Sequence, residues 1–157
     1  MKATGVSHIA VCVRDLEESL GFYRDVLGMK VKMQATQPMA GRSGAESTEM
    51  YQGQHESRTV ANVWFEGPNE EEVAPFLVLT SHPGDKVGGE PIKLDQRGIS
   101  HISFTVGDVS GVAAELERKG VPLAGRMADF TNAQGQVRTI FVYDPDGILV
   151  QLDEGPR

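Results

Sequence analysis

The chain has few of the features that mark secreted, membrane or nucleic-acid-binding proteins. Cys12 is alone among 157 residues, so no disulfide can form within the chain. No apolar run approaches the roughly 18 residues of a membrane-spanning helix, and the opening Met-Lys-Ala-Thr-Gly has no apolar signal core. Lysine and arginine form no cluster, and the net charge of −7 argues against nucleic-acid binding. We therefore expect a cytoplasmic protein with no nucleic-acid or membrane partner.

The composition that remains is that of an ordinary soluble globular protein. Hydrophobic residues make up 39% of the chain and charged residues 24%. A chain of 157 residues is long enough to bury a core as one domain, residues 1–157. An enzyme or a small-molecule binding protein is the default expectation.

Two histidines lie in near-copies of one segment, 93 positions apart. The residues that recur at this offset are Gly5, Ser7, His8, Ile9, Val13 and Asp15, matched by Gly98, Ser100, His101, Ile102, Val106 and Asp108. A duplicated half-domain is the simplest cause. Duplication places equivalent residues at symmetry-related positions, and two histidines brought together in this way can share a metal ion.

Each half has the pattern of one strand, one helix and three further strands. Asp15 and Asp108 suit helix N-caps, and Gly28 and Gly120 suit the helix stops. The predicted strands are 6–13, 29–36, 59–65 and 76–80 in the first half, and 99–106, 121–127, 137–143 and 148–152 in the second. Residues 37–57 read as a long loop with a short strand near Met50, and residues 81–97 as a Gly/Pro-rich connection.

The alternation within the strands predicts which sheet face carries the chemistry. Ile102 and Phe104 form an apolar face, whereas His101 and Ser103 lie on the opposite, polar face. One face is expected to pack on the helices and the other to border a wetted cavity. The order of elements predicts an α+β fold with the helices on the outer face of the sheet.

The chain resembles the vicinal oxygen chelate superfamily, which includes glyoxalase I, bleomycin-resistance proteins and extradiol dioxygenases. The motifs that carry the resemblance are His8-Ile-Ala-Val, Asp15-Leu, Phe22-Tyr23, Leu27-Gly28-Met29, His101-Ile-Ser-Phe-Thr-Val, Asp108 and Asp144-Pro-Asp-Gly-Ile-Leu-Val-Gln-Leu. The resemblance implies two β-α-β-β-β modules, about 4–81 and 98–154 with a linker of about 82–97, in a curved mixed sheet around a cavity. It also implies a homodimer that acts on a small-molecule substrate.

The resemblance implies a metal site at His8, His101 and Gln151. The superfamily commonly has glutamate at the position of Gln151, and its fourth ligand position falls on Val78, which cannot bind a metal ion. Two imidazoles and one amide leave the charge of a divalent ion uncompensated, so we expect an open, weakly charged site. Such a ligand set suits Fe(II), Mn(II), Ni(II) or Zn(II), and it does not choose among them.

Two functions from different classes follow. The first is a metal-dependent enzyme that chelates adjacent substrate oxygens, with dioxygenase-like chemistry favoured over lactoylglutathione-lyase chemistry because the usual base positions lack a carboxylate. The second is a metal-free protein that binds a drug or metabolite, as bleomycin-resistance proteins do. His55 and His82 lie in expected loops and are interpreted as solvated surface residues, and Cys12 as a buried, inert thiol.

Overall fold

The chain folds as two compact units, Met1–Gly88 and Gly89–Arg157. The computed structural model describes residues 2–40, 48–67, 69, 71–84 and 88–155. The boundary between the units lies inside the predicted connection 81–97. Each unit therefore contains one of the two duplicated segments.

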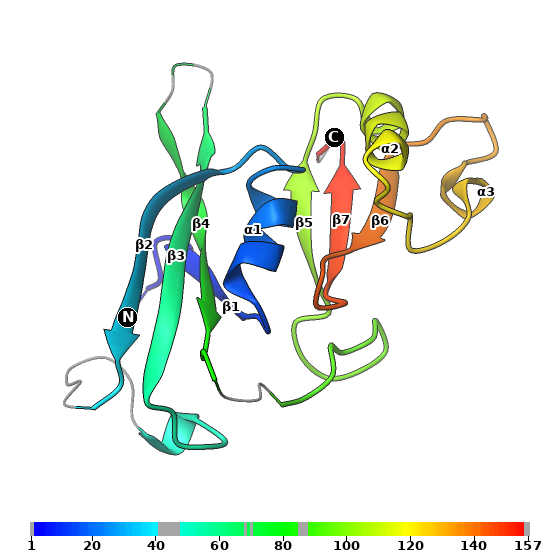
Figure 1. Ribbon diagram of the computed structural model, residues 1–157. Helices are drawn as coiled ribbons and strands as arrows, with labels where there is room; N and C mark the ends of the chain where they lie inside the picture. The colour runs from blue at the N-terminus through cyan, green and yellow to red at the C-terminus, as the bar shows by residue number, and fades with distance from the viewer. Residues whose placement is uncertain (1, 41–47, 68, 70, 85–87, 156–157) are drawn as a thin grey trace. The chain divides into compact units, whose positions relative to one another are not determined.

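Unit 1 is a four-stranded sheet with one helix (Figure 1). Its strands are β1 (His8–Cys12), β2 (Lys30–Pro38), β3 (Ser57–Glu66) and β4 (Glu72–Ser81), in the sheet order β1-β4-β3-β2. Strand β1 runs parallel to β4, and the other neighbours are antiparallel. The helix α1 (Leu16–Tyr23) follows β1 in the chain, which gives the predicted order β-α-β-β-β.

Local chemistry sets the ends of α1. The Asp15 carboxylate accepts a hydrogen bond of 2.9 Å from the Glu18 backbone N–H, which satisfies one of the free donors of the first turn. The helix ends at Tyr23 with Arg24 as its C-cap, so it stops before the predicted position at Gly28. Gly28 ends the turn that follows, where its φ of +75° favours glycine over a residue with a side chain.

The core of unit 1 lies between α1 and one face of the sheet. Leu20 and Tyr23 of α1 are fully buried. The sheet contributes buried side chains from every second position of its strands. These buried strand residues are Val11, Ala61, Val63, Leu77 and Leu79. The hydrophobic contact between helix and sheet is the main source of stability in such a layered unit.

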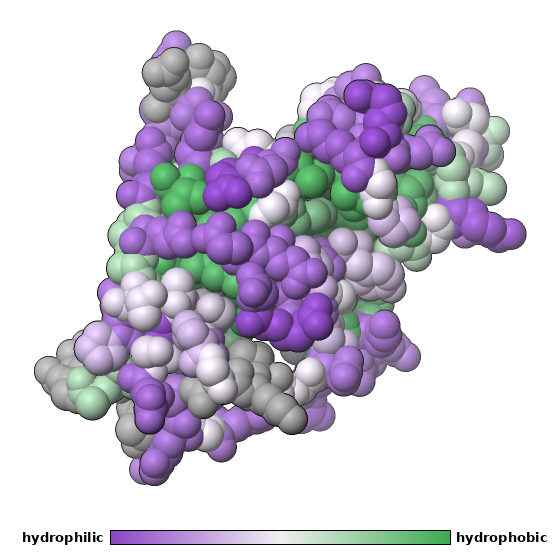
Figure 2. All heavy atoms as spheres, viewed as in Figure 1, coloured by the Kyte–Doolittle hydropathy of each residue, from purple (hydrophilic) through white to green (hydrophobic). Residues whose placement is uncertain are grey.

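Unit 2 repeats this plan with one strand fewer. Its sheet contains β5 (His101–Thr105), β6 (Thr139–Tyr143) and β7 (Leu149–Asp153) in the order β5-β7-β6, with β5 parallel to β7. The helix α2 (Val109–Arg118) begins at Asp108, whose carboxylate accepts a 3.0 Å hydrogen bond from the Gly111 backbone N–H. Hydrophilic residues cover the α2 region in the space-filling view, and hydrophobic residues show beneath it (Figure 2).

The structure confirms the predicted α+β fold and corrects two predicted strands. Residues 121–127 form no strand: Leu123 makes a single β-bridge to Val142, and the chain then enters the short helix α3 (Met127–Phe130). Pro122 lacks an N–H and Gly125 is a poor strand former, so this edge cannot continue a ladder. The short strand expected near Met50 is instead the 3-10 helix η1 (Thr48–Met50). None of the described helices is long and apolar enough to cross a membrane.

Candidate metal and ligand site

In each unit the face of the sheet opposite the buried core is the more accessible one, and we call it the open face. In unit 1 the open face comprises His8, Ala10, Cys12, Asn62, Trp64, Phe76, Val78 and Thr80. In unit 2 it comprises His101, Ser103, Thr105, Phe141, Tyr143, Leu149, Gln151 and Asp153. Each open face therefore includes one of the duplicated histidines, as the alternation predicts.

Strand register shows which residues of the two units are equivalent. On the parallel pair of each unit, His8 lies opposite Phe76 and His101 lies opposite Leu149. The strand that pairs in parallel with the histidine strand, β4 in unit 1 and β7 in unit 2, is called the closing strand here. Two residues further along, the closing strand carries Val78 in unit 1 and Gln151 in unit 2. Val78 and Gln151 thus occupy equivalent positions, one apolar and one polar.

The imidazole of His8 ends a row of rings on the open face of unit 1. The Trp64 and Phe76 rings stack with centroids 4.2 Å apart and an interplanar angle of 15°. The His8 ring lies 5.4 Å from Phe76, tilted by 33°. These side chains are at least partly accessible, and His8 is exposed. The row forms an apolar, aromatic wall beside the histidine.

Cys12, which we expected to be buried, is exposed on this face because its strand position alternates away from the core.

The open face of unit 2 is more polar. His101 is half-buried, and its ring contacts that of Phe141 edge-on at 5.6 Å. Gln151 is also half-buried and donates a 2.8 Å hydrogen bond from Nε2 to Oγ1 of Thr139. This bond fixes the amide so that its oxygen, the atom that binds metal ions, is left for another partner.

Each duplicated histidine has the same local partner. The Oγ atom of Ser7 lies 2.9 Å from Nδ1 of His8, and Oγ of Ser100 lies 2.9 Å from Nδ1 of His101. Because Nδ1 is engaged in both rings, Nε2 is the nitrogen left for a ligand. Metal-binding histidines typically use one ring nitrogen for the metal and the other for such a hydrogen bond.

The donor set is compatible with a divalent metal ion, although it is weak. Imidazole nitrogen and amide oxygen both coordinate Mn(II), Fe(II), Ni(II) and Zn(II). Within the described part of the chain, no three His, Cys, Asp or Glu side chains form a metal-binding group. The imidazole nitrogens of His8 and His101 and the amide oxygen of Gln151 are all neutral donors, and none of them balances the charge of a divalent ion.

The two remaining histidines form a cluster that the sequence did not predict. The rings of His55 and His82 stack with centroids 4.0 Å apart, and Tyr51 meets both edge-on. His82 is only 7% exposed, and its Nδ1 lies 3.2 Å from the Ser57 carbonyl oxygen. Placing His82 on the solvated surface was therefore wrong, because the residue directly after β4 is covered by the segment that follows η1. No local pattern in the sequence indicates this long-range pairing.

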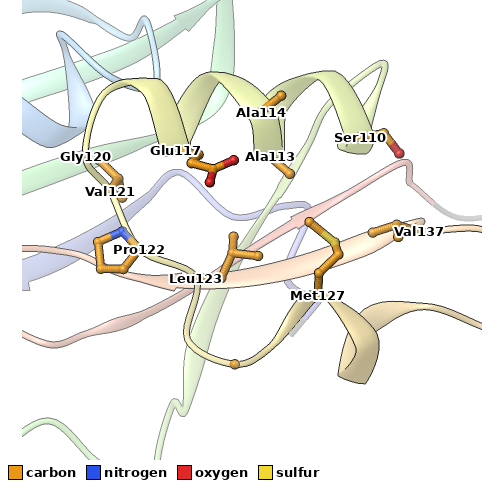
Figure 3. A pocket seen from close by; sticks show the side chains of 11 residues that line it. Ser110, Ala113, Ala114, Glu117, Gly120, Val121, Pro122, Leu123, Met127 and Val137 are labelled. Carbon is orange, nitrogen blue, oxygen red and sulfur yellow. The ribbon is translucent and has the colours of Figure 1, made fainter.

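A surface cavity of about 820 Å³ lies elsewhere in unit 2, beside α2. Ala113, Val121, Leu123 and Met127 line it with mainly apolar atoms, and Glu117 adds a carboxylate. The side chains of Leu123 and Met127 rise towards α2 (Figure 3). None of the open-face residues of unit 2 lines this cavity, so within this unit it is separate from the face that carries His101.

A family model places the chain among known proteins. The model of the Glyoxalase/Bleomycin resistance protein/Dioxygenase superfamily matches residues 5–152. The chain is 26% identical to the lactoylglutathione lyase of Schizosaccharomyces pombe over 165 aligned positions. That alignment covers 97% of this chain and 48% of the relative, so the chain spans about half the length of this relative.

Solved structures with the same fold include a glyoxalase I and a fosfomycin resistance protein. Leishmania major glyoxalase I matches with a TM-score of 0.63 and 24% identity, covering 97% of this chain and 88% of that one. A point mutant of the fosfomycin resistance protein FosX of Listeria monocytogenes matches with a TM-score of 0.58 and 17% identity. This match covers 99% of this chain and 95% of that one, and that protein was crystallised with Mn(II) and a dihydroxypropylphosphonic acid. At these identities the structural likeness establishes the fold.

Proposed function

Because the chain belongs to the Glyoxalase/Bleomycin resistance protein/Dioxygenase superfamily, we propose that it is an enzyme dependent on a divalent metal ion, with His8, His101 and Gln151 as the protein ligands. The observation that carries this proposal is the pair of matched histidines. Each lies at the start of its parallel strand, on the open face of its unit, with Nδ1 hydrogen-bonded and Nε2 left for a ligand. The substrate is a small molecule whose adjacent oxygens complete the metal shell.

When bound, the metal ion supplies Lewis acidity or, if it is iron, redox chemistry with dioxygen. The protein residues orient the substrate. The ring row of Trp64 and Phe76 offers an apolar contact beside His8, and Gln151 supplies a neutral donor. A neutral donor set binds an anionic oxygen chelate well, because the substrate then provides the charge that the protein ligands lack.

We favour a reaction with dioxygen over the isomerisation of a thiohemiacetal. Isomerisation needs a base that removes a proton from carbon, and the two equivalent closing-strand positions hold Val78 and Gln151. Neither side chain accepts a proton at neutral pH. The Fe(II)-loaded protein should consume dioxygen with a catechol or another vicinal-oxygen substrate. Turnover of a methylglyoxal–thiol adduct without oxygen uptake would reverse this assignment.

The proposed metal dependence is tested by calorimetric titration of chelator-treated protein with Mn(II), Ni(II) and Zn(II). We expect saturable binding at one ion per chain in the wild type and none in the His8→Ala/His101→Ala double variant. Circular dichroism of the variant checks that the fold is retained. Failure of all three ions to bind the wild type would overturn the proposal.

One observation favours a second function, the metal-free binding of an apolar ligand. The aromatic row and Val78 make the open face of unit 1 largely apolar. Trp64 is the only tryptophan, so its fluorescence reports directly on this wall. Stoichiometric quenching by a ligand in the presence of EDTA, unchanged in the His8→Ala/His101→Ala variant, would establish the binding function instead.

A further inference from the structure

Ser7 and Ser100 are duplicated polar residues to which fold and metal binding assign no role. Each directly precedes a histidine, and each places its hydroxyl 2.9 Å from Nδ1 of that ring. A serine side chain at the preceding residue is short, so in this arrangement it reaches the near nitrogen of the ring and leaves Nε2 untouched. The same contact in two separate units indicates a shared purpose.

The consequence of this contact is a choice of tautomer. A neutral imidazole carries its proton on one nitrogen and a lone pair on the other, and the hydrogen bond made by one nitrogen sets the state of its partner. If the serine hydroxyl accepts from Nδ1–H, the Nε2 lone pair is free to bind a metal ion. If the hydroxyl donates to Nδ1, Nε2 carries the proton and cannot bind.

We propose that Ser7 and Ser100 are positioning residues that accept a hydrogen bond from Nδ1–H and so hold His8 and His101 in the tautomer whose Nε2 lone pair faces outward. The direction of this hydrogen bond rests on the proposed metal function, because only that direction leaves Nε2 able to coordinate. A hydroxyl orients each ring without adding negative charge, unlike the carboxylates that often serve this purpose. The site then stays neutral apart from its metal and substrate.

The chain contains an internal reference for this tautomer. Nδ1 of His82 lies 3.2 Å from the carbonyl oxygen of Ser57. A carbonyl can only accept, so a neutral His82 carries its proton on Nδ1 whatever occurs at the two serines. The His82 resonances therefore show how this tautomer looks in the same sample.

The test is the long-range ¹H–¹⁵N spectrum of the histidine rings in metal-free protein. It is recorded at about pH 8.5, above the ordinary histidine pKa of about 6.5. We expect the wild-type rings of His8 and His101 to show a protonated Nδ1 and an unprotonated Nε2. In the Ser7→Ala/Ser100→Ala variant both rings should shift several-fold towards the Nε2–H form while His82 stays unchanged.

Two further variants separate a specific role from a general disturbance. The Ser7→Thr/Ser100→Thr variant keeps both hydroxyls and should keep the wild-type tautomers. Ser110 is an exposed serine on α2 and not on the open face, so Ser110→Ala should leave both rings unchanged. The affinity for Mn(II) should fall about 10–100-fold in the Ser7→Ala/Ser100→Ala variant, as is typical for the loss of outer-shell hydrogen bonds, and recover in the threonine variant.

The outcomes distinguish this inference from the function on which it rests. A wild-type spectrum with the proton on Nε2 of either ring would overturn the inference, as would an alanine variant with wild-type tautomers. The predicted tautomers together with no metal binding would overturn the metal function and leave the positioning role of Ser7 and Ser100 standing. The wild-type spectrum alone decides the tautomers if the double alanine variant fails to fold.

Discussion

The two units share a frame and differ in what they place on it. Both begin a parallel strand with a Ser–His pair, and both start the following helix with an aspartate cap. Beside the histidine, unit 1 carries the stacked rings of Trp64 and Phe76. At the equivalent closing-strand positions, unit 1 has Val78 and unit 2 has Gln151.

This difference indicates that the two duplicated units have different roles. The retained residues are those that start the strand, cap the helix and present an imidazole. The changed residues turn one open face into an apolar wall and the other into a source of polar ligands. The proposed function assigns one ligand, His8, to unit 1 and two ligands, His101 and Gln151, to unit 2.

The largest expected effect comes from removing either histidine. His8→Ala and His101→Ala should each weaken Mn(II) binding by more than the about 10–100-fold typical of an outer-shell change. Equal losses are expected if the two units contribute equivalent ligands. Calorimetry of the two single variants measures the comparison directly. A loss confined to His101→Ala would show that the metal belongs to unit 2 alone.

Core substitutions compare the stability of the units. Leu79 in unit 1 and Leu152 in unit 2 are both fully buried, so replacing either with alanine should lower the free energy of unfolding by about 2–5 kcal/mol. We predict a single unfolding transition that both variants shift, as expected for one domain. Urea denaturation followed by circular dichroism would contradict this if it gave two transitions and each variant moved only one.

A carboxylate introduced at the two equivalent positions should strengthen the site. Gln151→Glu and Val78→Glu each add a charged oxygen ligand, and we expect each to raise Mn(II) affinity roughly tenfold, about 1.4 kcal/mol. Gln134→Glu makes the same charge change on an exposed loop and serves as the control. Equal gains in all three variants would mean that net charge, rather than ligation, is responsible.

The smallest effects should come from the helix caps. Asp15→Ala and Asp108→Ala each remove one side-chain hydrogen bond to a first-turn N–H, and each should cost about 1 kcal/mol of unfolding free energy. Asparagine at either position should be nearly neutral because its oxygen also caps. Thermal denaturation of the four variants measures this. A much larger loss in one unit would show that the caps are not equivalent.

The sequence predicted the features that depend on local rules. Alternation in the strands identified the open face, and the caps at Asp15 and Asp108 and the stop at Gly120 followed from side-chain and backbone chemistry. The stop predicted at Gly28 was wrong, because α1 already ends at Tyr23. The repeat of Ser and His was visible too, although the hydrogen bond between them was not.

The features that sequence missed depend on distant partners or on competing local preferences. Burial of His82 requires His55 and Tyr51, which lie more than twenty residues earlier in the chain. The stacking of Trp64 on Phe76 depends on the register between β3 and β4, which a single strand does not encode. At 121–127 the apolar pattern favoured a strand, but Pro122 prevented a continuous ladder.

Elemental analysis of freshly purified, anaerobically handled protein tests the central claim most directly. The sample is compared with the His8→Ala/His101→Ala variant prepared in the same way. We predict close to one Fe, Mn, Ni or Zn ion per chain in the wild type and none above background in the variant. Wild-type protein that contains no such metal, and that takes up none when these ions are supplied, would contradict the account.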